Sequence, residues 1–137
     1  MTVRGRSTTI GRVERHRSRS TAPWCRHHPR PATGFPAVRE HAPHNNFDSF
    51  IAVKRAVQGV RRCGSAAIDL CMVADGTYDA YWERSLHAWD TAAASAVVLG
   101  AGGVVTALGG DPVDHHVGHI AASNGLLHRA LLAAIAS

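Results

Sequence analysis

Residues 64–106 read GSAAIDLCMVADGTYDAYWERSLHAWDTAAASAVVLGAGGVVT, and this stretch decides the fold class. Residues 66–74 are apolar on nearly all sides, which predicts a buried helix that begins after Ser65. In residues 78–83, Tyr78, Ala80 and Trp82 alternate with Asp79 and Tyr81, and this pattern predicts a strand. A second helix is predicted from about Asp90 to Val98, followed by a strand at residues 104–107.

The flanking segments continue this alternation of helix and strand. The predicted elements are the end of a strand with a turn at 33–36, a helix from Asn45 or Asn46 to about Gln58, a short strand at 60–62, a strand at 119–122, and a helix from about 125 to 136 capped by Asn124. Strands that alternate with helices indicate an α/β layered domain. The order of the strands is not readable from the pattern.

The positive charge of the chain is confined to its start. Residues 1–30 hold eight Arg and one acid, whereas residues 31–137 carry a net charge of −2. The first 30 residues show no hydrophobic period, so we predict a disordered basic leader, with the folded domain at 31–137. Two interpretations of the leader stay open: an arm that touches polyanions, or a segment that is not native to the protein. Nucleic acid is not expected to bind the rest of the chain.

The cysteines and the apolar runs bear on compartment. Cys25, Cys63 and Cys71 form no CxxC pair, which is typical of a reducing cytoplasm, and we expect Cys63 and Cys71 to be buried small hydrophobes. The longest apolar stretch, residues 92–108, is interrupted by glycines and is short for a membrane span of about 20 residues. We therefore predict a cytoplasmic protein with no membrane contact.

Several carboxylates are candidates for chemistry. Asp90 lies at a predicted helix start, where it can cap the helix or face a divalent cation, because hard cations take carboxylate oxygens. Asp69 is the single charge on an otherwise apolar helix and needs a partner. Asp114, His115, His116 and His119 do not follow a known zinc-site spacing and are assigned surface or structural roles.

Five segments carry a family resemblance: Gly-Ser-Ala-Ala-Ile-Asp-Leu at 64–70, Tyr-Asp-Ala-Tyr-Trp-Glu at 78–83, Trp-Asp-Thr-Ala-Ala at 89–93, Ala-Gly-Gly-Val-Val-Thr at 101–106 and Ala-Ser-Asn at 122–124. In order and spacing they resemble the C-terminal half of the inositol monophosphatase family. Thr-Gly-Phe-Pro at 33–36 also looks like a family element, so the resemblance covers about residues 31–137. It implies the C-terminal subdomain of that family's layered α/β sandwich.

The resemblance implies roles for five residues. Asp90 matches a magnesium ligand, and Glu83 matches the acceptor of a hydrogen bond from an inositol hydroxyl. Gly64, Ser65 and Ala66 match the loop whose backbone lies against the inositol ring. The implied activity is magnesium-dependent hydrolysis of a phosphate monoester, with an inositol monophosphate as substrate. Fructose bisphosphate and adenosine bisphosphate, which relatives handle, remain alternatives.

The resemblance also implies that most magnesium ligands belong to a glutamate-bearing segment and an Asp-Pro-Ile/Leu-Asp-Gly-Thr segment, which the 137 residues do not contain. Asp-Pro-Val-Asp at 111–114 lacks the Gly-Thr and is interpreted as a surface turn. One carboxylate cannot hold two or three magnesium ions, so we expect the chain to be inactive alone. The competing hypothesis is a non-catalytic binding or structural half-domain, which exposes an apolar face and pairs with an N-terminal half or with itself.

Overall fold

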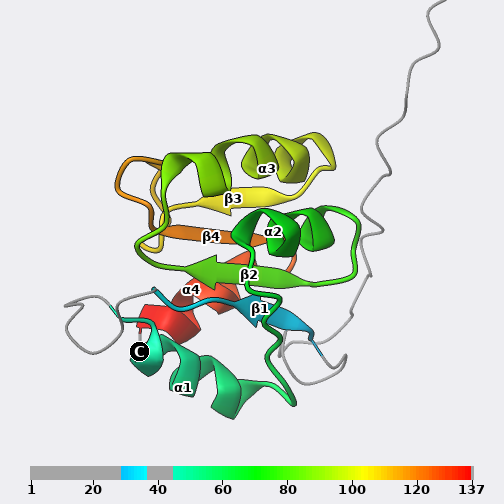
Figure 1. Cartoon of the computed structure of the whole chain (residues 1–137). Helices are drawn as coiled ribbons and strands as arrows, with labels where there is room; N and C mark the ends of the chain where they lie inside the picture. Colours follow the sequence, from blue (N-terminus) through cyan, green and yellow to red (C-terminus); the bar gives the residue numbers. More distant parts are fainter. Residues whose placement is uncertain (1–28, 37–44, 137) are drawn as a thin grey trace, which may run out of the picture.

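The computed structural model describes residues 29–36 and 45–136, which form one mixed sheet flanked by helices (Figure 1). The elements, in chain order, are β1 (Pro31–Thr33), α1 (Phe47–Ala56), α2 (Ala66–Ala74), β2 (Ala80–Glu83), α3 (Ala88–Gly100), β3 (Val104–Thr106), β4 (Ile120–Ser123) and α4 (His128–Ala136). The α/β class predicted from the sequence is confirmed. Of the leader predicted at residues 1–30, residues 1–28 lie outside the described residues.

The four strands lie in the order β1-β2-β4-β3. β1 runs parallel to β2, with Ala32 opposite Tyr81, and the β2–β4 and β4–β3 pairs are antiparallel. The short strand predicted at residues 60–62 is a single bridge, in which Arg61 pairs with Ala32. Because β1 and β2 are parallel, their carboxyl ends meet at one edge of the sheet.

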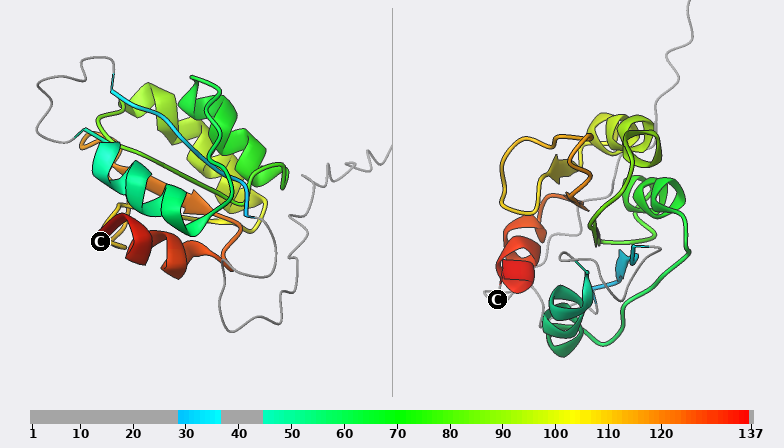
Figure 2. Two further views of the ribbon diagram at one scale, coloured as in Figure 1. Left: turned by 90° about the horizontal axis from the view of Figure 1, so that it is seen from below. Right: turned by 60° about the vertical axis from the view of Figure 1, so that its left-hand side comes forward.

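Helices cover both faces of the sheet, α2 and α3 on one and α1 and α4 on the other (Figure 2). Tyr81 packs in the core beneath α2 and α3, whereas Trp82 packs beneath α1 and α4. The strand predicted at residues 78–83 forms at Ala80–Glu83, and all four of its residues are buried. A central strand with a helix layer on each face has no solvent side.

Other local expectations also need correction. Cys63 and Cys71 are exposed rather than buried. The last helix begins at His128, three residues later than predicted, because the Asn124 side chain accepts a hydrogen bond from the Leu126 amide in a turn. Among the described residues, none of the helices is long and apolar enough to cross a membrane.

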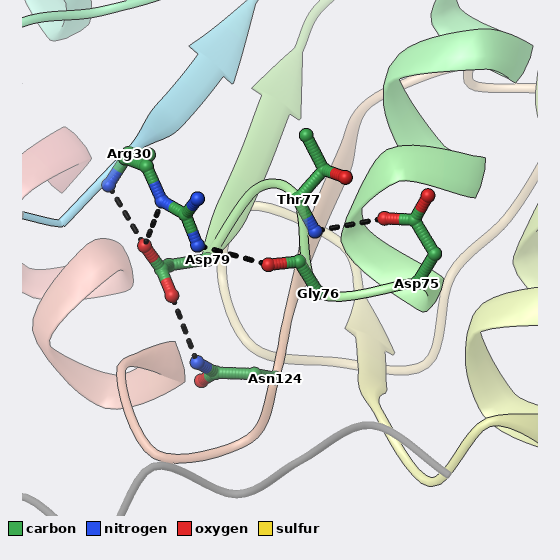
Figure 3. A network of polar contacts seen from close by, with 6 residues as sticks. All are labelled: Arg30, Asp75, Gly76, Thr77, Asp79 and Asn124. Carbon is green, nitrogen blue, oxygen red and sulfur yellow. Dashed lines mark hydrogen bonds and ion pairs between the residues drawn. The ribbon is translucent and has the colours of Figure 1, made fainter. Parts of the chain in front are cut away.

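Residues just before β1 are tied to the domain by a polar network at the start of β2 (Figure 3). The Arg30 amide donates to the Asp79 carboxylate at 2.9 Å, and its guanidinium donates to the Gly76 carbonyl. Asp79 also accepts a long hydrogen bond from Asn124, at the end of β4. This network joins three segments at the edge of the sheet opposite the carboxyl ends of β1 and β2.

Candidate functional site

A pocket of about 230 Å³ opens where β1 and β2 end and where α2 and α3 begin. All five residues predicted from the sequence, Gly64, Ser65, Ala66, Glu83 and Asp90, line it. Sequence reasoning did not assign a site role to the other lining residues, Gly34, Phe35, Arg62, Asp69 and Leu86. Three separate segments thus bring the candidate residues together, although their individual roles stay predictions.

Gly64, Ser65 and Ala66 bring the start of α2 to the pocket. Ser65 occupies the N-cap position, but its side chain makes no cap hydrogen bond. The preceding Gly64 has a φ of 85°, a backbone conformation that residues other than glycine rarely adopt. The first N–H groups of a helix lack partners within the helix, so an oxygen atom of a ligand can satisfy them here.

Glu83 is held rigidly at the end of β2. It is 7% exposed, and its carboxylate accepts a hydrogen bond from the Tyr81 hydroxyl two residues earlier on the same face of the strand. Burial raises the pKa of Glu83, and the nearby Asp69 raises it further, while the Tyr81 hydroxyl and Arg62 oppose the shift. The Glu83 carboxylate also lies against Gly34, where an added Cβ would lie 2.1 Å from Oε2, the oxygen that accepts from Tyr81.

Asp90 occupies the third position of α3 rather than the N-cap suggested by its place in the sequence. Its Oδ2 accepts a hydrogen bond from the backbone N–H of His87, the N-cap residue, at 3.0 Å. This contact fixes the carboxylate at the helix start. Oδ1 makes no hydrogen bond to the described residues, so one oxygen remains available to a ligand in the pocket.

Asp69 is a third carboxylate at the pocket wall, and its position on an apolar helix was the only signal for it. The side chain is 1% exposed, and Oδ1 has no hydrogen-bond partner among the described residues. Burial raises the pKa of Asp69, although hydrogen bonds from Cys63 and the charge of Arg62 oppose this. A buried carboxylate with an unpaired oxygen destabilises the free protein.

We therefore expect Asp69→Asn to raise the melting temperature at pH 7. The raised pKa means that the folded state binds this proton more tightly than the unfolded state, so stability is lost as the pH rises through the folded pKa. Removing the charge should gain about 1 kcal/mol or more at neutral pH, roughly 4 °C for a domain of this size. The gain should shrink toward pH 4. Thermal unfolding across pH 4–8, with the exposed Asp48→Asn as control, tests this; a lower melting temperature at pH 7 contradicts it.

The described residues do not make a magnesium site by themselves. Mg²⁺ requires about six oxygen ligands in near-octahedral geometry. Asp90 offers one free carboxylate oxygen, and no group of three His, Cys, Asp or Glu side chains among the described residues is placed to hold a metal ion. Asp90 thus fits a ligand of a larger set, whose other members would come from elsewhere.

The three histidines between β3 and β4 make hydrogen bonds that stabilise the fold. His115 Nδ1 is hydrogen-bonded to the Thr91 hydroxyl at 2.8 Å, and His119 Nδ1 accepts from the Ser85 amide at 3.2 Å. The His116 amide donates to the Asp114 carboxylate at 2.8 Å, which closes a turn. These contacts tie the segment after β3 to the start of α3 and to the end of β2.

Comparison with known proteins gives a consistent result. A model of the inositol monophosphatase family matches residues 14–137. The chain is 46% identical over 105 residues to an inositol-1-monophosphatase of Synechocystis, and 40% identical over 107 residues to the Nus factor SuhB of Pseudomonas aeruginosa. These alignments cover 77% and 75% of this chain, but 37% and 39% of the two relatives.

A solved structure shares the fold. The inositol monophosphatase of Anabaena (Nostoc) superimposes with a TM-score of 0.76 at 42% sequence identity, over 79% of this chain and 44% of the Anabaena chain. The chain therefore spans less than half the length of these relatives.

Proposed function

Because this chain belongs to the inositol monophosphatase family, whose members are phosphatases, we propose that it forms the polyol-binding side of a magnesium-dependent phosphate monoesterase acting on an inositol monophosphate. The observation that carries the proposal is the convergence of Glu83, Asp90 and the open start of α2 on one pocket. This pocket offers both acceptors and donors. A ring bearing several hydroxyls requires both kinds of partner.

Each residue has a distinct role in the proposal. Glu83 accepts a hydrogen bond from a ring hydroxyl, and a charged acceptor strengthens that bond. The backbone of Gly64, Ser65 and Ala66 donates to ring oxygens, since the N–H groups there have no cap partner. Asp90 contributes one oxygen to magnesium, which when bound activates water and stabilises charge on the leaving oxygen.

The pocket favours a polyol over the free phosphate. Three carboxylates, Asp69, Glu83 and Asp90, line it against one cation, Arg62. This excess of negative charge repels a phosphate dianion unless cations lie between them. We infer that this chain's residues hold the ring while metal ions held largely by other residues hold the phosphate. Fructose bisphosphate and adenosine bisphosphate remain alternative substrates.

A second observation supports association with a complementary polypeptide. The exposed residues of α3 are all apolar, and most of them recur at spacings of three and four: Trp89, Ala92, Ala93, Ala96, Val97, Leu99 and Gly100. We call these residues the outer face of α3. The buried side of the helix is the more polar one, since it includes Thr91 and Ser95. A helix that is apolar all round belongs in a protein interior.

We infer that the outer face of α3 packs against polypeptide corresponding to the part of the relatives that has no counterpart in these 137 residues. More than half of each relative's length falls in that part. Ile68 of α2, the helix that packs against α3, is also half exposed. The competing occupant of the outer face of α3 is a second copy of this chain, which corresponds to the non-catalytic alternative.

Glu83→Gln tests the proposed pocket without requiring catalysis. We expect the 137-residue chain to bind myo-inositol, as followed by two-dimensional NMR, and the variant to bind it about tenfold or more weakly, because a charged acceptor contributes about 1.5–3 kcal/mol. Arg129→Glu on exposed α4 is the control and should leave binding unchanged. Equal binding by Glu83→Gln and the original chain would remove Glu83 from the site.

A further inference from the structure

Asn46 stands at the N-cap position of α1 but does not cap the helix. The Phe47 amide instead donates to the side chain of Asn45. Asn46 is fully buried, and its Nδ2 donates to the Gly34 carbonyl at 2.9 Å and to the Thr33 hydroxyl at 2.6 Å. Asparagine at this position usually caps its own helix, but the Asn46 side chain instead stabilises the segment at Thr33 and Gly34.

The bonds of Asn46 belong to a closed and buried polar network. Its Oδ1 accepts from the Ser49 hydroxyl at 2.8 Å, and Ser49 in turn accepts from the Trp82 indole N–H at 3.2 Å. Thr33 donates to the Trp82 carbonyl, which returns the network to β2 one residue before Glu83. A fully bonded buried network of this kind fixes the position of each member.

Gly34 connects this network to the pocket. The space that a Cβ would fill at Gly34 is taken by the Glu83 carboxylate, at 2.1 to 2.3 Å from the ideal Cβ position. A small displacement of the Gly34 backbone therefore changes the room available to Glu83. Asn46 holds that backbone through the Gly34 carbonyl, but Asn46 does not itself line the pocket.

We propose that Asn46 is a positioning residue for Glu83: through the Gly34 carbonyl it holds the wall against which the Glu83 carboxylate rests. This inference rests on the proposed function, in which Glu83 accepts from a polyol hydroxyl. It also implies that α1, which packs on one face of the sheet, controls a pocket formed with α2 and α3 on the other (Figure 2). The Glu83 carboxylate is thus held by the hydrogen bond from Tyr81 to Oε2 and by its close packing against Gly34.

Asn46→Ala and Ser49→Ala form a matched pair. Both delete a buried member of the same network, but only Asn46 bonds to Gly34. We expect both variants to melt at lower temperature than the original chain. Binding of myo-inositol should weaken about tenfold or more in Asn46→Ala and less than about twofold in Ser49→Ala, a difference that NMR titration resolves. A purely structural role predicts losses of affinity that follow the losses of melting temperature.

A ligand-free measurement separates this inference from the proposed function. The carbon-13 shift of the Glu83 carboxyl should move in Asn46→Ala and stay in Ser49→Ala. If it moves while the original chain binds no inositol, the proposed function fails and the positioning role stands. If the shift stays, or if Asn46→Ala binds inositol as well as the original chain does, the positioning role is overturned.

If Asn46→Ala does not fold, a measurement on the unsubstituted chain tests the positioning role instead. The side-chain amide signals of Asn46 should shift when inositol is added, whereas those of Asn124, another buried asparagine, should not. Asn124 bonds to Asp79 in the network at the opposite end of β2 (Figure 3). An unshifted Asn46 amide in a chain that binds inositol contradicts the coupling.

Discussion

Gly34→Ala should abolish most polyol binding while leaving the chain folded. The added methyl would lie 2.1 Å from a carboxylate oxygen of Glu83, so one of the two groups must move. The end of a glutamate side chain moves more readily than the Gly34 backbone, which Asn46 holds directly and which follows the last paired residue of β1. We expect the Glu83 carboxylate to leave the Tyr81 hydroxyl. Overpacking of this kind costs about 1–3 kcal/mol of stability.

The loss of affinity should exceed what the loss of stability explains. A displaced Glu83 loses both its intramolecular bond and its place against the ligand, so affinity for myo-inositol should fall roughly 10- to 100-fold by NMR titration. Gly109→Ala is the matched control, because its Cβ meets only the Asp111 side chain at 3.3 Å. Glu83→Asp in the Gly34→Ala background should restore part of the stability, since the shorter side chain vacates the space. Unchanged affinity in Gly34→Ala excludes Glu83 as a ligand contact.

The regular elements could be predicted because their signals are local. The apolar run at 66–74 and the glycine pair at 102–103 set the limits of α2 and α3 within about two residues. The burial of Tyr81 could not be predicted, because it depends on α2 and α3 covering the second face of the sheet. The exposure of Cys71 likewise follows from which side of α2 faces the sheet, whereas Cys63 lies before the helix begins.

The site residues that belong to sequence motifs could be predicted, and the others could not. Gly64, Glu83 and Asp90 were identified by resemblance, and the structure brings them to one pocket. Asp69 gave a partial signal as a charge on an apolar helix, but its unpaired oxygen is a property of the packing. Gly34 and Asn46 gave no site signal, because their importance lies in contacts between segments that are 12 and 49 residues apart in the chain.

Phosphatase activity should be absent from the 137-residue chain and should appear when a complementary polypeptide is supplied. Asp90 leaves one free oxygen, and the described residues include no group of three placed to hold a metal. Phosphate release from inositol monophosphate with Mg²⁺ should therefore stay at background. Co-expression with the N-terminal part of the Anabaena relative should raise it, because the matched part of that relative has the same fold as this chain. High activity of the chain alone that survives Asp90→Ala contradicts the proposed mechanism.

Two variants divide the causes of any restored activity. Asp90→Ala should return the rate to background while the complex still forms, because the substitution removes the proposed metal ligand and leaves the interface unchanged. Val97→Glu should prevent the complex itself, because it places a charge on the outer face of α3, where burial without a partner is costly. Arg129→Glu on exposed α4 should change neither result. Size-exclusion chromatography distinguishes the two effects: if Val97→Glu leaves the complex intact, the outer face of α3 is not the docking surface, and if the unmodified chain elutes as a dimer that Val97→Glu dissociates, a second copy is its occupant.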